Sequence, residues 1–295
     1  MQIKNNRGFR RILLRGLHKV SLEVGWLSLA KIIPIPTGTI FNPDILDVRI
    51  YEWRTWQHTK HNGFGLVMDA VLSPVLLLLI FSYLFGGAMA GSTGAYIQFL
   101  LPGILILTVV PMTVYSGTTI CSDITKGVYN RFRTLPFWQP ASVLGSILTD
   151  GLRYTVGVIV ALGTGLALGF RPEGSVIQIV LAIAFILFFA FSVSWIFALI
   201  GVAAKRPETV SGSSMIAIYP LLFASNILVD SSTMPKWTGI LIDLNPISMA
   251  AATVRGLMNG TATLPVIMTG IGVCVVIITI FTPLTLYLYQ TKNER

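Results

Sequence analysis

Residues 176–203 read VIQIVLAIAFILFFAFSVSWIFALIGVA, a run without any Asp, Glu, Lys or Arg. A helix needs about 20 apolar residues to cross the ~30 Å hydrocarbon core of a bilayer, and this run is long enough. The rest of the chain has the same character, since 54% of its 295 residues are hydrophobic, 11% are charged, and the mean hydropathy is +0.75. A soluble domain of this size cannot cover so much apolar surface. The sequence therefore predicts an all-α integral membrane protein.

Six stretches are long and apolar enough to span a membrane as helices. They are 66–86, 98–120, 154–170, 176–203, 215–229 and 264–289. The fifth is the shortest and contains Pro220, so its limits are the least well defined. Together they predict a six-helix transmembrane domain over residues 61–295. The alternating polarity of a membrane β-barrel is absent.

The distribution of Lys and Arg predicts the orientation of these spans. Ten of the 21 Lys and Arg residues precede residue 66, and others follow spans two, four and six, whereas the remaining connections are poor in them. An even number of spans, with both termini in the cytoplasm of a cell-membrane protein, satisfies the positive-inside rule. The net charge of +9 requires no nucleic-acid partner, because anionic membrane lipids and a partner protein account for it.

The N-terminal part divides into a basic cytoplasmic leader, 1–43, and an amphipathic segment, 44–60. In that segment Ile50, Trp53 and Trp56 share one helical face, and tryptophan suits the headgroup layer of a membrane. We expect an interfacial elbow helix that leads into the first span. An ordinary amphipathic helix beside the membrane, without a role in coupling, is the alternative.

A short basic link joins the second and third spans, with three cations against Asp123 alone. Apolar residues repeat there at helical spacing, a glycine allows a turn and a proline ends the segment. This pattern favours a short helix that docks on a soluble partner through its arginines, although a solvated loop that only fixes the topology is the alternative. Its candidate residues are Lys126, Gly127, Val128, Arg131, Phe132, Arg133, Leu135 and Pro136.

Charged residues within the spans are scarce. Asp150 and Arg153 are spaced three apart, which predicts an interfacial ion pair just below the third span. An unpaired charge at the centre of a membrane helix costs about 2.5–3.5 kcal/mol and is usually kept for function. The sequence requires no such charge, which disfavours a proton-driven carrier.

Polar and aromatic residues in the second and fifth spans form a candidate pathway for an amphipathic cargo. They are Thr113, Tyr115, Ser116, Tyr219, Ser225 and Asn226. Residues of these types also bind helices to one another, and that role is the alternative. The external stretch 230–263 contains Pro235, Trp237, Asn245 and Pro246, and we expect two short re-entrant helices that gate the exit. An ordinary structured loop is the alternative there.

A set of motifs occurs in a fixed order along the chain. It consists of LFGG at 84–87, the basic link up to Pro136, DGLR at 150–153, GFR at 169–171, SN at 225–226, MPKW at 234–237, NP at 245–246 and RGLMNG at 255–260. With this set, residues 44–290 resemble the membrane subunit of ABC-type exporters of the type-2 permease family. They most resemble the daunorubicin-resistance-type drug-export permeases.

The resemblance implies a permease that exports drugs or other amphipathic compounds, with the basic link as a coupling helix on a separate ATP-binding subunit. The sequence has no Gly-x4-Gly-Lys-Ser/Thr motif, so we expect no enzyme activity or cofactor on this chain, and ATP and Mg²⁺ on the partner. Two ATP-binding subunits and a second permease copy, or a homologue, would complete the exporter. Export of a lipid-linked glycan or polysaccharide is the alternative function, and an ion-coupled secondary carrier is a weaker one.

Overall fold

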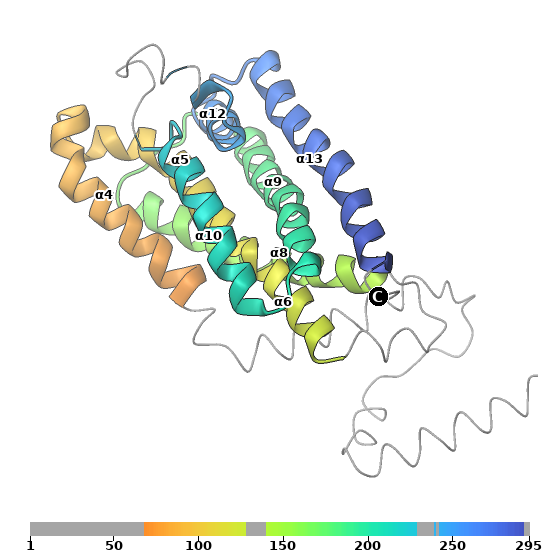
Figure 1. Cartoon of the computed structure of the whole chain (residues 1–295). Coiled ribbons are helices and arrows are strands. Elements are labelled where there is room, and N and C mark those ends of the chain that lie inside the picture. The colour runs from red at the N-terminus through yellow and green to blue at the C-terminus, as the bar shows by residue number, and fades with distance from the viewer. Residues whose placement is uncertain (1–67, 128–139, 229–238, 240–241, 292–295) are drawn as a thin grey trace, which may run out of the picture. The chain divides into compact units, whose positions relative to one another are not determined.

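The computed structural model describes residues 68–127, 140–228, 239 and 242–291 (Figure 1). The chain divides into the units Met1–Asn42 and Pro43–Arg295, and all of the described residues lie in the second. Within the described residues the regular secondary structure is entirely helical, which confirms the all-α prediction. The elements are the π-helical turn η2 (Met68–Leu72), α4 (Ser73–Ala90), α5 (Thr93–Met112), α6 (Val114–Thr125), α8 (Pro140–Ala167), α9 (Val176–Ala203), α10 (Pro207–Phe223), α12 (Pro246–Met258) and α13 (Leu264–Thr291).

Five helical stretches among the described residues are long and apolar enough to cross a bilayer. They are Ala70–Gly87, Thr93–Thr125, Val143–Ala167, Val176–Ala203 and Leu264–Thr291. The counterpart of the expected fifth span is α10, which has 17 residues and begins at Pro207 instead of 215. Pro207 and Glu208 suit the first turn of a helix. A hydropathy pattern does not include them in a span, because Glu208 is charged, and this accounts for the difference.

The third span also begins earlier than the sequence indicates. Hydropathy alone suggested a start at 154, whereas α8 begins at Pro140 and its apolar window begins at Val143. The intervening turns contain Asp150 and Arg153, whose charges lower the hydropathy of this region. In the structure these two side chains are paired with each other, so the helix continues through them.

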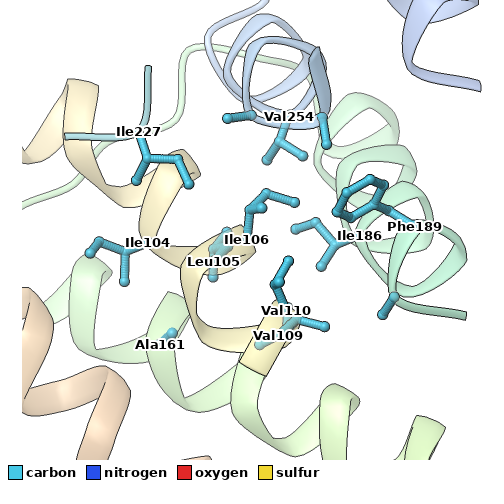
Figure 2. Close-up of a cluster of buried hydrophobic side chains, with 14 of the residues drawn as sticks. Ile104, Leu105, Ile106, Val109, Val110, Ala161, Ile186, Phe189, Ile227 and Val254 are labelled. Carbon is cyan, nitrogen blue, oxygen red and sulfur yellow. The ribbon is translucent and has the colours of Figure 1, made fainter. Parts of the chain in front are cut away.

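The core of the described bundle forms around α5. Most of the span Thr93–Thr125 is buried, whereas most of α13 is not. Figure 2 shows apolar side chains of α5 facing those of four other segments. The labelled residues are Ile104, Leu105, Ile106, Val109 and Val110 from α5, Ala161 from α8, Ile186 and Phe189 from α9, Val254 from α12, and Ile227. Helix α5 therefore lies at the centre of this core, whereas α13 packs mainly on α9 and α12.

Helices α6 and α9 approach each other at a pair of glycines. A Cβ atom on Gly117 would collide with the carbonyl group of Phe197, and one on Gly201 would collide with the backbone of Gly117. Small residues allow such backbone contact between membrane helices. This crossing fixes α6 against α9, and α6 supplies part of the candidate site.

We expect Gly201→Ala to lower the thermal unfolding midpoint of the purified protein in detergent. The added methyl group has no space, and overpacking of this kind costs about 1–3 kcal/mol. Gly163→Ala is the matched control, because a Cβ at Gly163 in α8 meets nothing within 4 Å. Equal midpoints for Gly201→Ala and the wild type would show that the helices are not in this close contact.

Candidate functional site

A cavity of about 400 Å³ lies among α4, α5, α6 and α10. Its walls are mainly apolar and aromatic, and include Phe81 from α4, Pro111 and Met112 from α5, Tyr115 from α6, and Tyr219 and Phe223 from α10. Ligand sites for small molecules are typically about 300–1,000 Å³ in volume and are lined in this way, with few polar groups. The cavity is therefore large enough for part or all of a drug-sized amphipathic molecule.

Two of the six candidate pathway residues, Tyr115 and Tyr219, line this cavity. Tyr219 is 51% exposed and Tyr115 is 37% exposed, so both rings present surface to an incoming molecule. Large amphipathic rings of this type provide much contact area at little conformational cost. These two tyrosines are the sequence-derived candidates that the structure brings together.

The other four candidates have different surroundings. The hydroxyl groups of Thr113 and Ser225 donate locally, to the carbonyl oxygens of Val110 at 2.6 Å and Leu222 at 2.5 Å. Asn226 lies beyond α10, where its backbone N–H donates to the Ser248 hydroxyl group at 3.2 Å. Ser116 is fully buried in a polar cluster. The bonds of Thr113 and Ser225 are local, whereas those of Ser116 and Asn226 join separate segments, which is the kind of contact that the alternative role requires.

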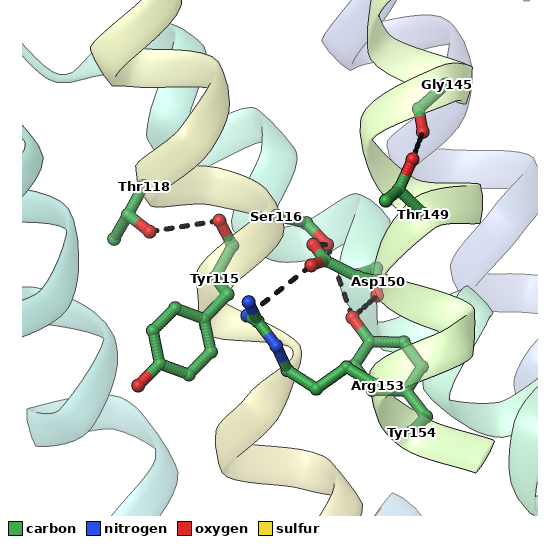
Figure 3. A network of polar contacts seen from close by, with 9 residues as sticks. Tyr115, Ser116, Thr118, Gly145, Thr149, Asp150, Arg153 and Tyr154 are labelled. Atoms are coloured by element: carbon green, nitrogen blue, oxygen red, sulfur yellow. Dashed lines mark hydrogen bonds and ion pairs between the residues drawn. The ribbon is translucent and has the colours of Figure 1, made fainter. Parts of the chain in front are cut away.

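The polar cluster joins α6, α8 and α9 (Figure 3). The Ser116 hydroxyl group donates to Asp150 Oδ2 at 2.7 Å and lies 3.2 Å from the Tyr154 hydroxyl oxygen. That oxygen is also 3.0 Å from Ser194 Oγ on α9. Arg153 Nη1 lies 3.5 Å from Asp150 Oδ1. A buried carboxylate is costly unless it is paired and hydrogen-bonded, and both conditions are met here.

The position of this ion pair differs from the expected one. The sequence suggested an interfacial pair below the third span, but Asp150 and Arg153 lie inside the candidate span Val143–Ala167. Their side chains are only 7% and 14% exposed. The spacing of Asp150 and Arg153 indicated that they form a pair. It could not indicate that the pair is buried, because the cluster around it includes Ser116 and Ser194, which are distant along the chain.

Arg153 also connects the polar cluster to the cavity. Its guanidinium carbon lies 4.4 Å from the centre of the Tyr115 ring, a distance typical of a cation–π contact. Figure 3 shows the arginine side chain between Asp150 and Tyr115. One side chain thus contacts both the buried carboxylate and an aromatic wall of the cavity.

The basic link lies mostly outside the described residues. The structure describes Lys126, which is exposed at the C-terminal end of α6, and Gly127. Gly127 has a φ of +69°, a left-handed conformation that favours glycine, so the turn expected there is present. The remaining candidates of the link fall outside the described residues: Val128, Arg131, Phe132, Arg133, Leu135 and Pro136. The same is true of Ile50, Trp53 and Trp56 of the expected elbow helix.

Of the four external gate candidates, the structure describes Asn245 and Pro246, while Pro235 and Trp237 lie outside the described residues. Asn245 caps α12, since its Oδ1 accepts a hydrogen bond from the Ile247 N–H at 2.9 Å. Its Nδ2 donates to the carbonyl oxygens of Leu221 at 2.7 Å and Ala224 at 2.8 Å. The Asn245 side chain therefore caps the start of α12 and donates hydrogen bonds to two carbonyl groups at the end of α10.

Sequence reasoning gave no role to Arg255 of α12. Its Nε donates to the Phe99 carbonyl oxygen at 3.3 Å, and its Nη2 donates to the Asn226 carbonyl oxygen at 3.1 Å. The guanidinium carbon also lies 3.9 Å from the centre of the Phe99 ring. The signal for such a role in the sequence was a single arginine in an apolar external segment. The partners of Arg255, however, are backbone groups of distant segments, and no sequence pattern identifies them.

We expect Asn245→Ala to destabilise the fold through the junction of α10 and α12. The change removes a helix cap, worth about 1 kcal/mol, and leaves two carbonyl groups without this donor. Thermal unfolding in detergent measures the effect. Asn259→Ala at the other end of α12 is the control, because the structure shows no side-chain hydrogen bond for Asn259 among the described residues. Equal losses in the two variants would refute the bridging role of Asn245.

Among the described residues, no group of three or more His, Cys, Asp or Glu side chains is placed to hold a metal ion. The site that the structure offers is instead an apolar cavity with a polar cluster beside it. Its arrangement suits the binding of an amphipathic molecule, and the comparisons with known proteins point to transport.

The ABC-2 type transporter family matches residues 47–259. The chain is 51% identical over 243 residues to the daunorubicin resistance ABC transporter permease protein DrrB1 of Streptomyces coeruleorubidus, covering 82% of this chain and 85% of that protein. It is 23% identical over 217 residues to the probable doxorubicin resistance ABC transporter permease protein DrrC of Mycobacterium tuberculosis, covering 71% and 78%.

The putative transport permease ycf38 of Cyanophora paradoxa is 27% identical over 201 residues, covering 65% of this chain and 68% of that protein. The family match covers most of the chain and includes every described segment from α4 to α12. The resemblance drawn from the ordered motifs is thereby confirmed. This chain belongs to the ABC-2 type transporter family, in which it is a permease subunit.

Proposed function

We propose that this permease forms the export path for drugs or other amphipathic compounds and is driven by a separate ATP-binding subunit. The observation that carries the proposal is the cavity of about 400 Å³ with Tyr115 and Tyr219 in its walls. Its volume and apolar lining suit a planar, partly polar molecule. The relatives with drug-resistance names support the same cargo class.

The energy source is assigned to a partner because this sequence has no phosphate-binding Gly-x4-Gly-Lys-Ser/Thr motif. The pair Asp150–Arg153 is internally compensated, which disfavours an ion-coupled carrier. An exporter of a lipid-linked glycan or polysaccharide would favour a wide aromatic-lined channel over a cavity of about 400 Å³. We assign ATP and Mg²⁺ to two ATP-binding subunits, and a second permease copy or homologue to the other half of the path.

The orientation belongs to the same proposal. A buried cluster joins the C-terminal ends of α6, α9 and α13 to the N-terminal end of α8, through Ile120, Val202, Tyr289 and Val143. The cations that follow those helices, including Lys126, Lys205 and Arg206, therefore leave the bundle at one end. The positive-inside rule assigns that end to the cytoplasm.

With α10 as a sixth crossing, both termini lie on the cytoplasmic side. Its 17 residues extend about 26 Å at a rise of 1.5 Å per residue, which is close to the thickness of the hydrocarbon core. An even number of crossings is what the distribution of Lys and Arg requires.

The test of this function is the ATPase activity of the complex that the permease forms with its ATP-binding subunit, after co-expression and purification. We expect daunorubicin to stimulate ATP hydrolysis by the complex in lipid, because cargo in the cavity favours the transport cycle. The isolated ATP-binding subunit is the control. Hydrolysis that daunorubicin and other amphipathic compounds leave unchanged would argue against the proposed function.

We expect Tyr219→Ala to raise the daunorubicin concentration that gives half-maximal stimulation by about three- to tenfold, because an aromatic contact contributes about 0.5–1.5 kcal/mol. Tyr287→Ala is the matched control, since Tyr287 is 66% exposed on α13 and does not line the cavity. A Tyr219→Ala response identical to that of the control would show that this cavity does not bind the cargo.

A further inference from the structure

Arg153 makes two contacts of different kinds with one guanidinium group. Its Nη1 lies 3.5 Å from Asp150 Oδ1, and its carbon lies 4.4 Å from the centre of the Tyr115 ring. An ion pair alone does not require the cation to lie over an aromatic ring. The second contact therefore constrains Tyr115 in a way that the first does not.

Tyr115 and the residue that follows it each contact α8. The neighbouring residue, Ser116, donates to Asp150 Oδ2 at 2.7 Å, while Arg153 covers the Tyr115 ring. Both Asp150 and Arg153 belong to α8, one turn apart (Figure 3). Two adjacent residues of α6 are thus attached to two residues on one side of α8.

The ring that Arg153 covers is part of the cavity wall. Tyr115 lines the cavity and is 37% exposed, so its orientation affects the shape of the space that a cargo molecule enters. Tyr219 and Met215 of α10 lie in the same lining. A rotation of the Tyr115 ring would change the space between α6 and α10.

We propose that Arg153 is a positioning residue, which holds the Tyr115 ring in the orientation that admits a planar aromatic cargo. The proposal rests on the proposed function, because the cavity has to be the cargo site. Arg153 acts through Tyr115 and does not contact the cargo. Arg153 therefore affects the specificity for cargo indirectly, through the orientation of the Tyr115 ring.

Lysine is the informative replacement at this position. A lysine ammonium group retains the charge that pairs with Asp150, but it lacks the flat guanidinium plane that stacks on a ring. Arg153→Lys therefore separates the ion pair from the stacking contact. We expect the charge balance of the buried cluster to remain while Tyr115 loses its fixed orientation.

The experiment measures equilibrium binding of daunorubicin, through its own fluorescence, to the purified complex of permease and ATP-binding subunit. We expect Arg153→Lys to raise the Kd about threefold to tenfold, the range that a cation–π contact of this kind represents. In a Tyr115→Leu background the same substitution should leave the Kd unchanged within about twofold, since the ring that it positions is absent. A purely structural role of Arg153 would give the same increase in both backgrounds.

Tyr115→Leu alone provides an arm that leaves Arg153 intact. It removes the ring that Arg153 covers, so we expect it to raise the Kd at least as much as Arg153→Lys does. Wild-type affinity of Tyr115→Leu, or additive effects of Arg153→Lys and Tyr115→Leu, would overturn the positioning role while wild-type binding persists. A wild-type complex that does not bind daunorubicin or other planar aromatic compounds would refute the proposed function itself, and the positioning role with it.

Discussion

Replacing Arg131 and Arg133 together with glutamate is expected to release the ATP-binding subunit from the permease. Both arginines belong to the basic link between α6 and α8, which we assign to the coupling contact. Charge reversal turns attraction to carboxylates into repulsion, and losing buried charge pairs at an interface costs about 2–5 kcal/mol. Affinity should then fall at least about thirtyfold, as measured by co-purification and by the loss of daunorubicin-stimulated ATP hydrolysis.

The matched control is Lys205→Glu with Arg206→Glu. These two cations are exposed between α9 and α10 and carry the same charge as the arginine pair. We expect that control complex to remain intact. If the Arg131 and Arg133 variant also co-purifies at the wild-type ratio, with unchanged stimulation, the link only fixes the topology and is not a coupling helix.

Replacing Asp150 with leucine is expected to be the most damaging single substitution in the described core. The change leaves Arg153 buried without its carboxylate, and breaking a buried ion pair in this way costs about 3–5 kcal/mol. Ser116 also loses its acceptor at 2.7 Å. The measurement is thermal unfolding in detergent, followed by the yield of monodisperse protein.

The double variant Asp150→Leu with Arg153→Met tests the cause of that loss. Apolar replacement of both partners of a buried pair is often neutral for stability, because no uncompensated charge remains. We therefore expect the double variant to unfold closer to the wild type than the single variant does. A double variant as unstable as Asp150→Leu alone would show that the pair itself, and not the unpaired arginine, determines stability here.

The sequence predicted most about the fold where a segment is uniformly apolar. The bounds of α9 coincide with the quoted stretch 176–203, because a run without charges is bounded at its start by a capping box of Ser175 and Gln178. The start of α8 differed because Asp150 and Arg153, about three to four turns into the helix, resemble the edge of a span when read without their partners. Pairing across a helix turn is visible in a sequence, but the burial of that pair depends on α6.

The candidate site could be predicted in part. Of the polar and aromatic candidates in the second and fifth spans, Tyr115 and Tyr219 line the cavity, and their role in a pathway stays a prediction. Composition could not separate these two from Thr113 and Ser225, whose hydroxyl groups donate to carbonyl groups three residues earlier. The contact of Arg255 with Phe99 could not be found either, since it joins residues far apart in sequence. Side-chain direction and long-range contacts are the information that the sequence pattern lacks.

The central claim is that this permease moves its cargo only when a partner hydrolyses ATP. The most direct test is daunorubicin flux into sealed vesicles that contain the permease, with and without the ATP-binding subunit. We predict accumulation only when both proteins and external MgATP are present, and none with the permease alone under an imposed proton or sodium gradient. Accumulation by the permease alone, driven by an ion gradient, would contradict the account.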